Sequence, residues 1–296
     1  MMSVLKLNKF RPRVSIFRYS SRATAETTEI HDEVRFFEER SSAWWNEEGI
    51  MRLLIKMNPL RLAILQEYLT KAGLAHFAYS ETKTPLRGLK MLDVGCGGGL
   101  LSEALAKLGA DVTGVDAGKD LLEIARAHMA TDPQLQKHLR YQLSLIENFS
   151  ANHRDSFDAV VSSEVIEHVN NQEMFVKHCV ECVKPGGSII FTTMNRTLPG
   201  GFLNITFNEH IYRIMPKGTH SYNQFIRPRE LKNMLLKYNC KTVGVQGFTL
   251  NPFTETWFRM PVSWFNYALH AIKDGPNANQ ASATCKYAAF SDPGKN

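Results

Sequence analysis

Two acidic side chains and a histidine lie close together in the segment SEVIEHV, which covers residues 163–169. Glu164, Glu167 and His168 are spaced i, i+3 and i+4, so a helical turn would place both carboxylates and the imidazole on one face. Two oxygens and one nitrogen suit Mg²⁺, Mn²⁺ or Zn²⁺, and the spacing therefore predicts a divalent metal site. The alternative is that no metal binds. A glutamate would then help to hold a cofactor while His168 orients a neighbouring group, or His168 would act as a general base.

A glycine-rich turn lies earlier in the chain, where residues 92–99 read LDVGCGGG after an apolar run typical of a buried parallel strand. Gly95, Gly97 and Gly99 alternate, whereas a dinucleotide-binding turn has the spacing G-x-G-x-x-G. Because glycine has no Cβ, such a turn lets a ligand approach the backbone closely. The G-x-G-x-G spacing after an acidic strand end is that of methyltransferases that use S-adenosylmethionine (SAM), which makes NAD or FAD the weaker interpretation.

A carboxylate further along the chain supports the same cofactor. Asp116 follows the apolar run 111–115, at the distance where a carboxylate can accept hydrogen bonds from both ribose hydroxyls of an adenosine. We therefore expect Asp116 to bind the ribose of SAM.

The elements that must position these residues alternate along the chain. Buried strands are predicted over residues 89–94, 111–115, 140–145, 157–162 and 187–193. Helices over 100–108 and 121–129 separate the first three strands, and the last two strands, 241–248 and 265–272, form an antiparallel hairpin. This order predicts an α/β fold with a doubly wound, seven-stranded, mostly parallel sheet. The glycine turn and residues 163–169 should meet at the carboxyl edge of that sheet.

Helical periodicity also marks residues 30–45 and 58–69, before the first strand. We expect residues 30–84 to form an amino-terminal helical cap over the cofactor crevice, within one domain that covers 30–272. From 274 to 296 the composition of Gly, Pro, Asn, Ser and Ala predicts a flexible tail.

The net charge of +6 belongs to the amino terminus, because 6 of the 35 Lys and Arg residues lie within residues 1–25 and no acid does. The remaining 29 basic residues balance the 29 acidic ones, so the body gives no support for a nucleic-acid partner. An acid-free leader that contains Arg and Ser predicts a mitochondrial transit peptide over 1–25 and a matrix location. A disordered basic tail is the alternative.

The 5 cysteines are odd in number and scattered, which predicts a reducing compartment and no disulfide framework. Cys179 and Cys182 stand in a predicted helix before the strand 187–193. We interpret them as core packing, in preference to a redox or zinc site.

Several segments of the chain occur in the order found in one enzyme family. They read SAWWNEEG, NPLRL, LDVGCGGG, GADVTGVD, SEVIEHV, VKPGG, MPKGTH and LNPFT. From Trp44 to Ile272 the sequence resembles the mitochondrial ubiquinone biosynthesis O-methyltransferases, which are class I SAM-dependent methyltransferases. The resemblance implies that SAM contacts Arg61, Gly95, Asp116 and Ser163. It likewise implies that a divalent metal, expected to be Mg²⁺ before Mn²⁺ or Zn²⁺, binds Glu164, Glu167 and His168.

Two positions depart from the family pattern. Ser163 stands where the family can carry a larger apolar residue, which leaves open a contact with SAM through its backbone alone. Ser144 stands where relatives can carry an acid, so the end of the third strand is not expected to be a cofactor site.

The family transfers methyl groups to phenolic oxygens of polyprenylated catechols, namely a 3,4-dihydroxy-5-polyprenylbenzoate and a demethylubiquinol. A phenol has a pKa of about 10 and its oxyanion is the competent nucleophile, so lowering this pKa is part of the expected catalysis. A chelated cation would lower it, with His168 as a metal-free general base as the alternative. The resemblance also implies a multi-protein biosynthetic complex as partner.

Because a polyprenyl substrate is insoluble, the enzyme must meet it at a bilayer or through a partner. No run reaches about 18 apolar residues, which predicts peripheral contact with the membrane, on the matrix face of the inner membrane. An insertion over 196–220 is the candidate segment, since its apolar residues fall on one helical face near basic ones. These apolar residues are Leu203, Phe207, Ile211, Ile214 and Met215. A plain substrate lid is the alternative.

Two other functions compete with this one. RNA ribose 2′-O-methyltransferases also use a Glu/Glu/His metal site, but the neutral body argues against an RNA substrate. A non-catalytic scaffold of the biosynthetic complex would have no need for Asp93, Gly95, Gly97, Asp116 and the Glu/Glu/His set together.

Overall fold

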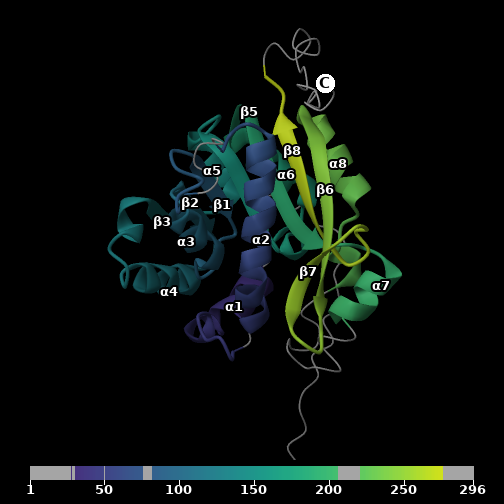
Figure 1. The fold of residues 1–296 in the computed structure, drawn as a ribbon, viewed down its shortest axis with the longest axis horizontal. Coiled ribbons are helices and arrows are strands. Elements are labelled where there is room, and N and C mark those ends of the chain that lie inside the picture. The colour runs from purple at the N-terminus through teal and green to yellow at the C-terminus, as the bar shows by residue number, and fades with distance from the viewer. Residues whose placement is uncertain (1–27, 29–30, 50, 76–81, 206–220, 276–296) are drawn as a thin grey trace, which may run out of the picture.

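The computed structural model describes residues 28, 31–49, 51–75, 82–205 and 221–275 of the 296 (Figure 1). The predicted transit peptide, most of the predicted tail and residues 206–220 of the predicted insertion lie outside the described residues. Among the residues that are described, no helix has the length and apolarity needed to cross a bilayer.

The fold is built on one sheet with the strand order β3-β2-β1-β4-β5-β8-β6-β7. Its strands are β1 (Lys90–Val94), β2 (Asp111–Asp116), β3 (Leu139–Leu143), β4 (Phe157–Ser163), β5 (Val183–Met194), β6 (Cys240–Asn251), β7 (Thr256–Met260) and β8 (Asn266–Lys273). Strands β1 to β5 pair in parallel, and β8 runs antiparallel to both β5 and β6. The predicted doubly wound sheet and its late antiparallel hairpin are confirmed.

The predicted number of seven strands is wrong, because the segment that joins the hairpin contains an eighth strand, β7. It pairs antiparallel with β6 at the edge of the sheet. Trp257 donates its indole N–H to the carbonyl of Leu53 at 3.0 Å, and Arg259 forms an ion pair with Glu67. Contacts with a helix some 200 positions earlier in the chain thus hold this strand, and no local pattern reports them.

Helices cover both faces of the sheet (Figure 1). They are α1 (His31–Glu38), α2 (Arg52–Lys71), α3 (Leu100–Lys107), α4 (Lys119–Met129), α5 (Ile146–Asn152), α6 (Gln172–Cys182), α7 (Leu198–Gly201) and α8 (Pro228–Lys237). The helix predicted over 30–45 is shorter, since α1 ends at Glu38 and a separate 3₁₀ turn, η1, covers Ser41–Ala43. Further 3₁₀ turns are η3 (Leu135–Lys137), η4 (Ile166–His168) and η6 (Tyr222–Gln224).

Alternate residues of the strands divide between two hydrophobic cores. Ile189 and Phe191 of β5 pack in the core formed with α5, α6 and α8, whereas Ile190 packs in the core formed with α2 and α3. This alternation follows from the two-residue period of a strand. Cys179 and Cys182 are buried in the first core, and burial raises the pKa of the Cys182 thiol to about 12. Their interpretation as core packing is confirmed.

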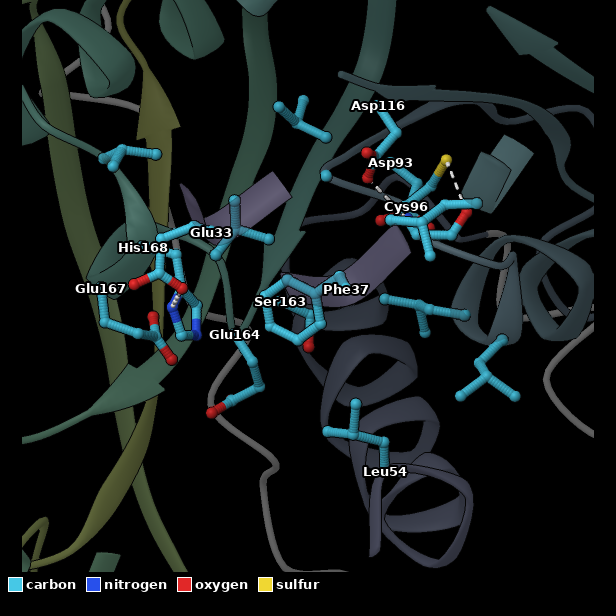
Figure 2. A pocket seen from close by; sticks show the side chains of 18 of the residues that line it. Glu33, Phe37, Leu54, Asp93, Cys96, Asp116, Ser163, Glu164, Glu167 and His168 are labelled. Carbon is cyan, nitrogen blue, oxygen red and sulfur yellow. Dashed lines mark hydrogen bonds and ion pairs between the residues drawn. The ribbon is translucent and has the colours of Figure 1, made fainter. Parts of the chain in front are cut away.

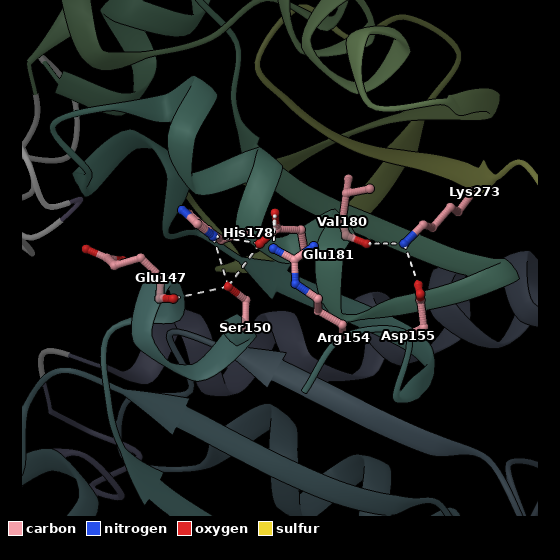
Figure 3. A network of polar contacts seen from close by, with 8 residues as sticks. All are labelled: Glu147, Ser150, Arg154, Asp155, His178, Val180, Glu181 and Lys273. Carbon is pink, nitrogen blue, oxygen red and sulfur yellow. Dashed lines mark hydrogen bonds and ion pairs between the residues drawn. The ribbon is translucent and has the colours of Figure 1, made fainter. Parts of the chain in front are cut away.

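A polar network joins α5, α6 and β8 away from the carboxyl edge of the sheet (Figure 3). Ser150 Oγ lies 2.9 Å from His178 Nδ1 and donates to Glu181 at 3.2 Å, and Glu181 also meets Nδ1 at 2.9 Å. Because both partners share one ring nitrogen, these three residues are not arranged as a proton relay. Lys273 donates to the carbonyls of Val180 and Val183, which stabilises the passage from α6 into β5.

The amino-terminal helices lie over the glycine turn. The indole of Trp45 donates to the carbonyl of Gly98 at 3.0 Å and stacks on His128 with ring centroids 3.4 Å apart. Trp44 covers Gly97 so closely that a Cβ on this glycine would lie 2.5 Å from the indole. The segment after α1 therefore covers the turn, as expected of a cap, and the domain boundaries remain predictions.

Candidate active site

A pocket opens at the carboxyl ends of the parallel strands (Figure 2). Its wall combines α1, α2, the glycine turn, the end of β2 and the segment after β4. All the site residues predicted from the sequence line it, namely Arg61, Gly95, Asp116, Ser163, Glu164, Glu167 and His168. The structure thus brings together residues that stand more than 100 positions apart in the chain.

The glycine turn forms one end of the pocket. Gly95, Gly97 and Gly99 have φ values of +73°, +52° and +90°, in the left-handed region that favours glycine. A Cβ on Gly95 would lie 2.5 Å from a methyl carbon of Val165. Both the conformation and the lack of space beside Val165 therefore require glycine at Gly95.

The Asp116 carboxylate is fixed by backbone donors. Gly97 N–H donates to Oδ2 at 2.7 Å, and Gly118 N–H donates to Oδ1 at 2.8 Å. Burial raises the pKa of Asp116 above its ordinary value, and these two hydrogen bonds oppose the rise. The carboxylate is thereby held in one orientation at the mouth of the turn.

Arg61 is a buried cation on α2. It donates from Nη1 to Ser163 Oγ at 2.9 Å and from Nη2 to Asn58 Oδ1 at 2.8 Å. Burial lowers the pKa of Arg61, while the nearby carboxylates of Glu164 and Asp93 raise it. Its Nε–H is buried without a partner among the described residues, so this donor remains for an anionic ligand.

Ser163 uses its hydroxyl within the protein. Its Oγ accepts from Arg61 and lies 2.7 Å from Thr192 Oγ1. These two contacts engage the hydroxyl within the protein, and whether Ser163 contacts a cofactor stays a prediction.

The helical turn predicted for Glu164, Glu167 and His168 is wrong. Glu164 has a φ of +57°, and the 3₁₀ turn η4 begins only at Ile166. Within the described part of the chain, no three His, Cys, Asp or Glu residues are arranged to hold a metal ion. The positive φ breaks the helical spacing on which the predicted convergence rested.

The two glutamates nevertheless lie in one wall of the pocket, each held through one oxygen. Glu164 Oε1 accepts from Thr192 and Glu167 Oε2 accepts from Thr193, both at 2.8 Å. Glu164 Oε2 and Glu167 Oε1 are buried and have no hydrogen-bond partner in the described ranges. Burial, together with the Glu167 carboxylate, raises the pKa of Glu164 to about 8.

His168 faces α1 at the same end of the pocket. Its Nδ1 lies 3.1 Å from Glu33 Oε2, and Phe37 packs edge-on against the imidazole with ring centroids 5.4 Å apart. Burial alone would lower the pKa of His168, but the hydrogen bond to Glu33 and the nearby carboxylates raise it above its ordinary value. Helix α1 therefore closes the acidic end of the pocket.

Sequence reasoning missed Glu33, Thr192 and Thr193. The two threonines could have been found, because they end a predicted parallel strand whose carboxyl end faces the same crevice. Glu33 carried no such signal, since its approach depends on how α1 packs.

This strand order, with a G-x-G-x-G turn after β1 and an acid at the end of β2, defines a class I SAM-dependent methyltransferase. The magnesium protoporphyrin IX methyltransferase of Synechocystis, solved with bound SAH, shares this fold. It superposes with a TM-score of 0.53 at 16% sequence identity, over 82% of this chain and 94% of its own. A family model described as a methyltransferase domain matches residues 61–245.

Curated relatives narrow this class. The mitochondrial ubiquinone biosynthesis O-methyltransferase of Rattus norvegicus is 39% identical over 263 residues, which cover 88% of this chain and 75% of the rat protein. The ubiquinone biosynthesis O-methyltransferase of Proteus mirabilis is 37% identical over 250 residues, which cover 83% of this chain and 95% of the bacterial protein. The chain belongs to the ubiquinone biosynthesis O-methyltransferase family.

Proposed function

We propose that this SAM-dependent O-methyltransferase acts on polyprenylated catechol intermediates of ubiquinone biosynthesis, a 3,4-dihydroxy-5-polyprenylbenzoate and a demethylubiquinol. The observation that carries the proposal is one pocket with two unlike ends. The glycine turn and Asp116 form a site suited to SAM, and the half-buried Glu164 and the buried Glu167 lie beside His168 at the other end. A methyl donor and a group that removes a phenolic proton would thus share one cavity.

The cofactor end suits each part of SAM. The Asp116 carboxylate suits the ribose hydroxyls, and Gly95 and Gly97 of the glycine turn line the same pocket. The unpaired Nε–H of Arg61 suits the carboxylate of the methionine part. Ser163 would contact the cofactor through its backbone.

Methyl transfer forms a bond between the phenolic oxygen and the methyl carbon and breaks the bond from that carbon to sulfur, so S-adenosylhomocysteine leaves. The phenolic proton must pass to the protein or to solvent, because a phenol with a pKa of about 10 is a weak nucleophile. Glu164, whose pKa is about 8, holds a proton more readily than an exposed carboxylate does. His168 lines the same end of the pocket and is the alternative base.

The donor chemistry of this end fits a divalent cation in part. Glu164 Oε2 and Glu167 Oε1 are buried, acidic and without partners within the described residues, as oxygen ligands of Mg²⁺ would be before binding. Glu164, Glu167 and His168 would hold the ion, which would lower the pKa of a bound catechol oxygen. In the described part of the chain these three side chains are not arranged to hold a metal ion. We therefore propose that they would have to move toward one another for the metal to bind.

We further propose that the enzyme works in mitochondria, peripherally on the matrix face of the inner membrane and within a biosynthetic complex. Support comes from the acid-free, basic sequence over residues 1–25 and from the name of the rat relative, which describes that protein as mitochondrial. Exposed apolar side chains also lie close in sequence to Asn204 and Asn266, which line the pocket. Leu198, Phe202 and Trp264 are 83%, 60% and 56% exposed, and Thr197 joins α7 to Trp264 by a hydrogen bond.

The test is methyl transfer from labelled SAM to a short-chain prenylated catechol, with EDTA and then with Mg²⁺, Mn²⁺ or Zn²⁺ added back. Metal-restored activity that disappears in Glu164→Ala and His168→Ala would support metal-assisted O-methylation. Activity that resists EDTA would assign proton removal to His168 or Glu164 without metal. SAM binding by calorimetry with no transfer to any catechol would contradict the proposed substrate class.

A further inference from the structure

Two consecutive threonines stand just before Met194, the last residue of β5, and contact the acidic end of the pocket. Thr192 and Thr193 are buried, with 2% and 0% of their surface exposed. Because strand residues alternate, Thr192 shares the face of Ile190, which packs with α2 and α3, and Thr193 shares the face of Phe191, which packs with α5, α6 and α8. The two hydroxyls therefore point to opposite faces of one strand end.

Each hydroxyl holds a different glutamate from the same short segment. Thr192 Oγ1 donates to Glu164 Oε1 and Thr193 Oγ1 donates to Glu167 Oε2, both at 2.8 Å. Thr192 also accepts the backbone N–H of Glu164 at its carbonyl, at 2.9 Å. The segment that follows β4 is thus attached to β5 on both faces, and the left-handed backbone at Glu164 is part of this attachment.

On the α2 face, hydrogen bonds run from Arg61 through Ser163 and Thr192 to Glu164, and each residue donates to the next. Thr192 has a single hydroxyl proton, which it gives to Glu164, so it accepts from Ser163 across the 2.7 Å contact. Ser163 in turn accepts from Arg61 Nη1 at 2.9 Å. The buried guanidinium of Arg61 is thereby linked to the carboxyl group of Glu164 through two hydroxyls, each of which polarises the next.

We propose that Thr192 and Thr193 are positioning residues, which fix the carboxylates of Glu164 and Glu167 so that one oxygen of each remains unpaired for the reaction. Thr192 additionally couples the glutamate to Arg61 and hence to the cofactor end. The inference rests on the proposed function, in which this acidic end receives the phenol. Without the hydroxyls, each carboxylate loses the partner that fixes its orientation, and Arg61 loses the acceptor at the end of its chain.

The experiment replaces each threonine with valine, which keeps the β-branched shape and removes the hydroxyl. Thr192→Val and Thr193→Val should each lower kcat for methyl transfer by about 10-fold or more, the effect of one lost hydrogen bond to a charged group. Only Thr192→Val should also raise the Kd of SAM measured by calorimetry, because only Thr192 continues the chain from Arg61. Thr192→Ser and Thr193→Ser should restore both quantities.

Thr249→Val is the matched control. Thr249 is a buried strand threonine outside the pocket wall, and its Oγ1 has no partner among the described residues. This variant should leave kcat and the Kd of SAM unchanged. If Thr249→Val lowers kcat as much as the two test variants do, any buried threonine-to-valine change would lower activity by disturbing packing. That result would overturn the proposal.

Two further results would also overturn it: kcat within about twofold of the wild type in both valine variants, or failure of serine to restore the loss. If Thr192→Val does not fold, Ser163→Ala breaks the same chain, and an unchanged Kd of SAM there would contradict the coupling. A wild-type chain that binds SAM but methylates no catechol would contradict the proposed function alone. In that case the SAM-binding comparison still tests the role of Thr192.

Discussion

Substitution of Gly95 by alanine should be costly for two separable reasons. Gly95 has a φ of +73°, and an L-residue in the left-handed region costs about 1–2 kcal/mol. The new Cβ would also lie 2.5 Å and 2.7 Å from the two methyl carbons of Val165, and overpacking of this kind costs about 1–3 kcal/mol. We therefore expect Gly95→Ala to lower the free energy of unfolding by about 2–5 kcal/mol.

Gly73 provides the matched control, because its φ is +72° and a Cβ there would meet nothing within 4 Å among the described residues. Gly73→Ala should show the conformational cost alone, and the gain from a less flexible unfolded chain is common to both variants. Urea unfolding measures the difference.

The steric part should be relieved in the double variant Gly95→Ala/Val165→Ala, which removes both colliding methyl groups. A double-mutant cycle should then give a favourable coupling of about 1–3 kcal/mol. Equal losses in Gly95→Ala and Gly73→Ala, or a cycle with no coupling, would refute the argument that space as well as conformation requires glycine at this turn.

Three other outcomes follow from the structure. Burial lowers the pKa of His270 to about 4, so below about pH 6.5 the unfolded chain binds a proton at this residue that the folded chain does not bind. Up to about 3 kcal/mol of the free energy of unfolding should therefore be lost between pH 6.5 and pH 4. In urea unfolding, His270→Gln should show a smaller loss over this pH range. Asp116→Asn should raise the Kd of SAM by about 10-fold or more in calorimetry, since the ribose loses a charged acceptor; an unchanged Kd would remove Asp116 from the cofactor site. Phe202→Asp should abolish flotation with anionic liposomes while Leu236→Asp, an exposed leucine on α8, should not; flotation of both would contradict membrane docking through α7.

Local patterns in the sequence determined the framework of the cofactor site. The five parallel strands, the glycine turn and Asp116 were predicted because strand composition and glycine spacing are local properties of the chain. The rule that parallel strands end at one crevice then placed the glycine turn beside residues 163–169. The structure brings these residues into one pocket.

Tertiary packing alone decided how the acidic residues are held. The spacing of Glu164, Glu167 and His168 indicates a helical turn, but Glu164 has a left-handed backbone, donates its N–H to the Thr192 carbonyl and accepts from the Thr192 hydroxyl. Strand β7 and the approach of Glu33 to His168 likewise depend on partners far away in the chain. A local pattern reports the preference of a segment by itself. The backbone of Glu164 depends instead on hydrogen bonds with Thr192, a distant residue of β5, and such bonds can offset the cost of a strained φ.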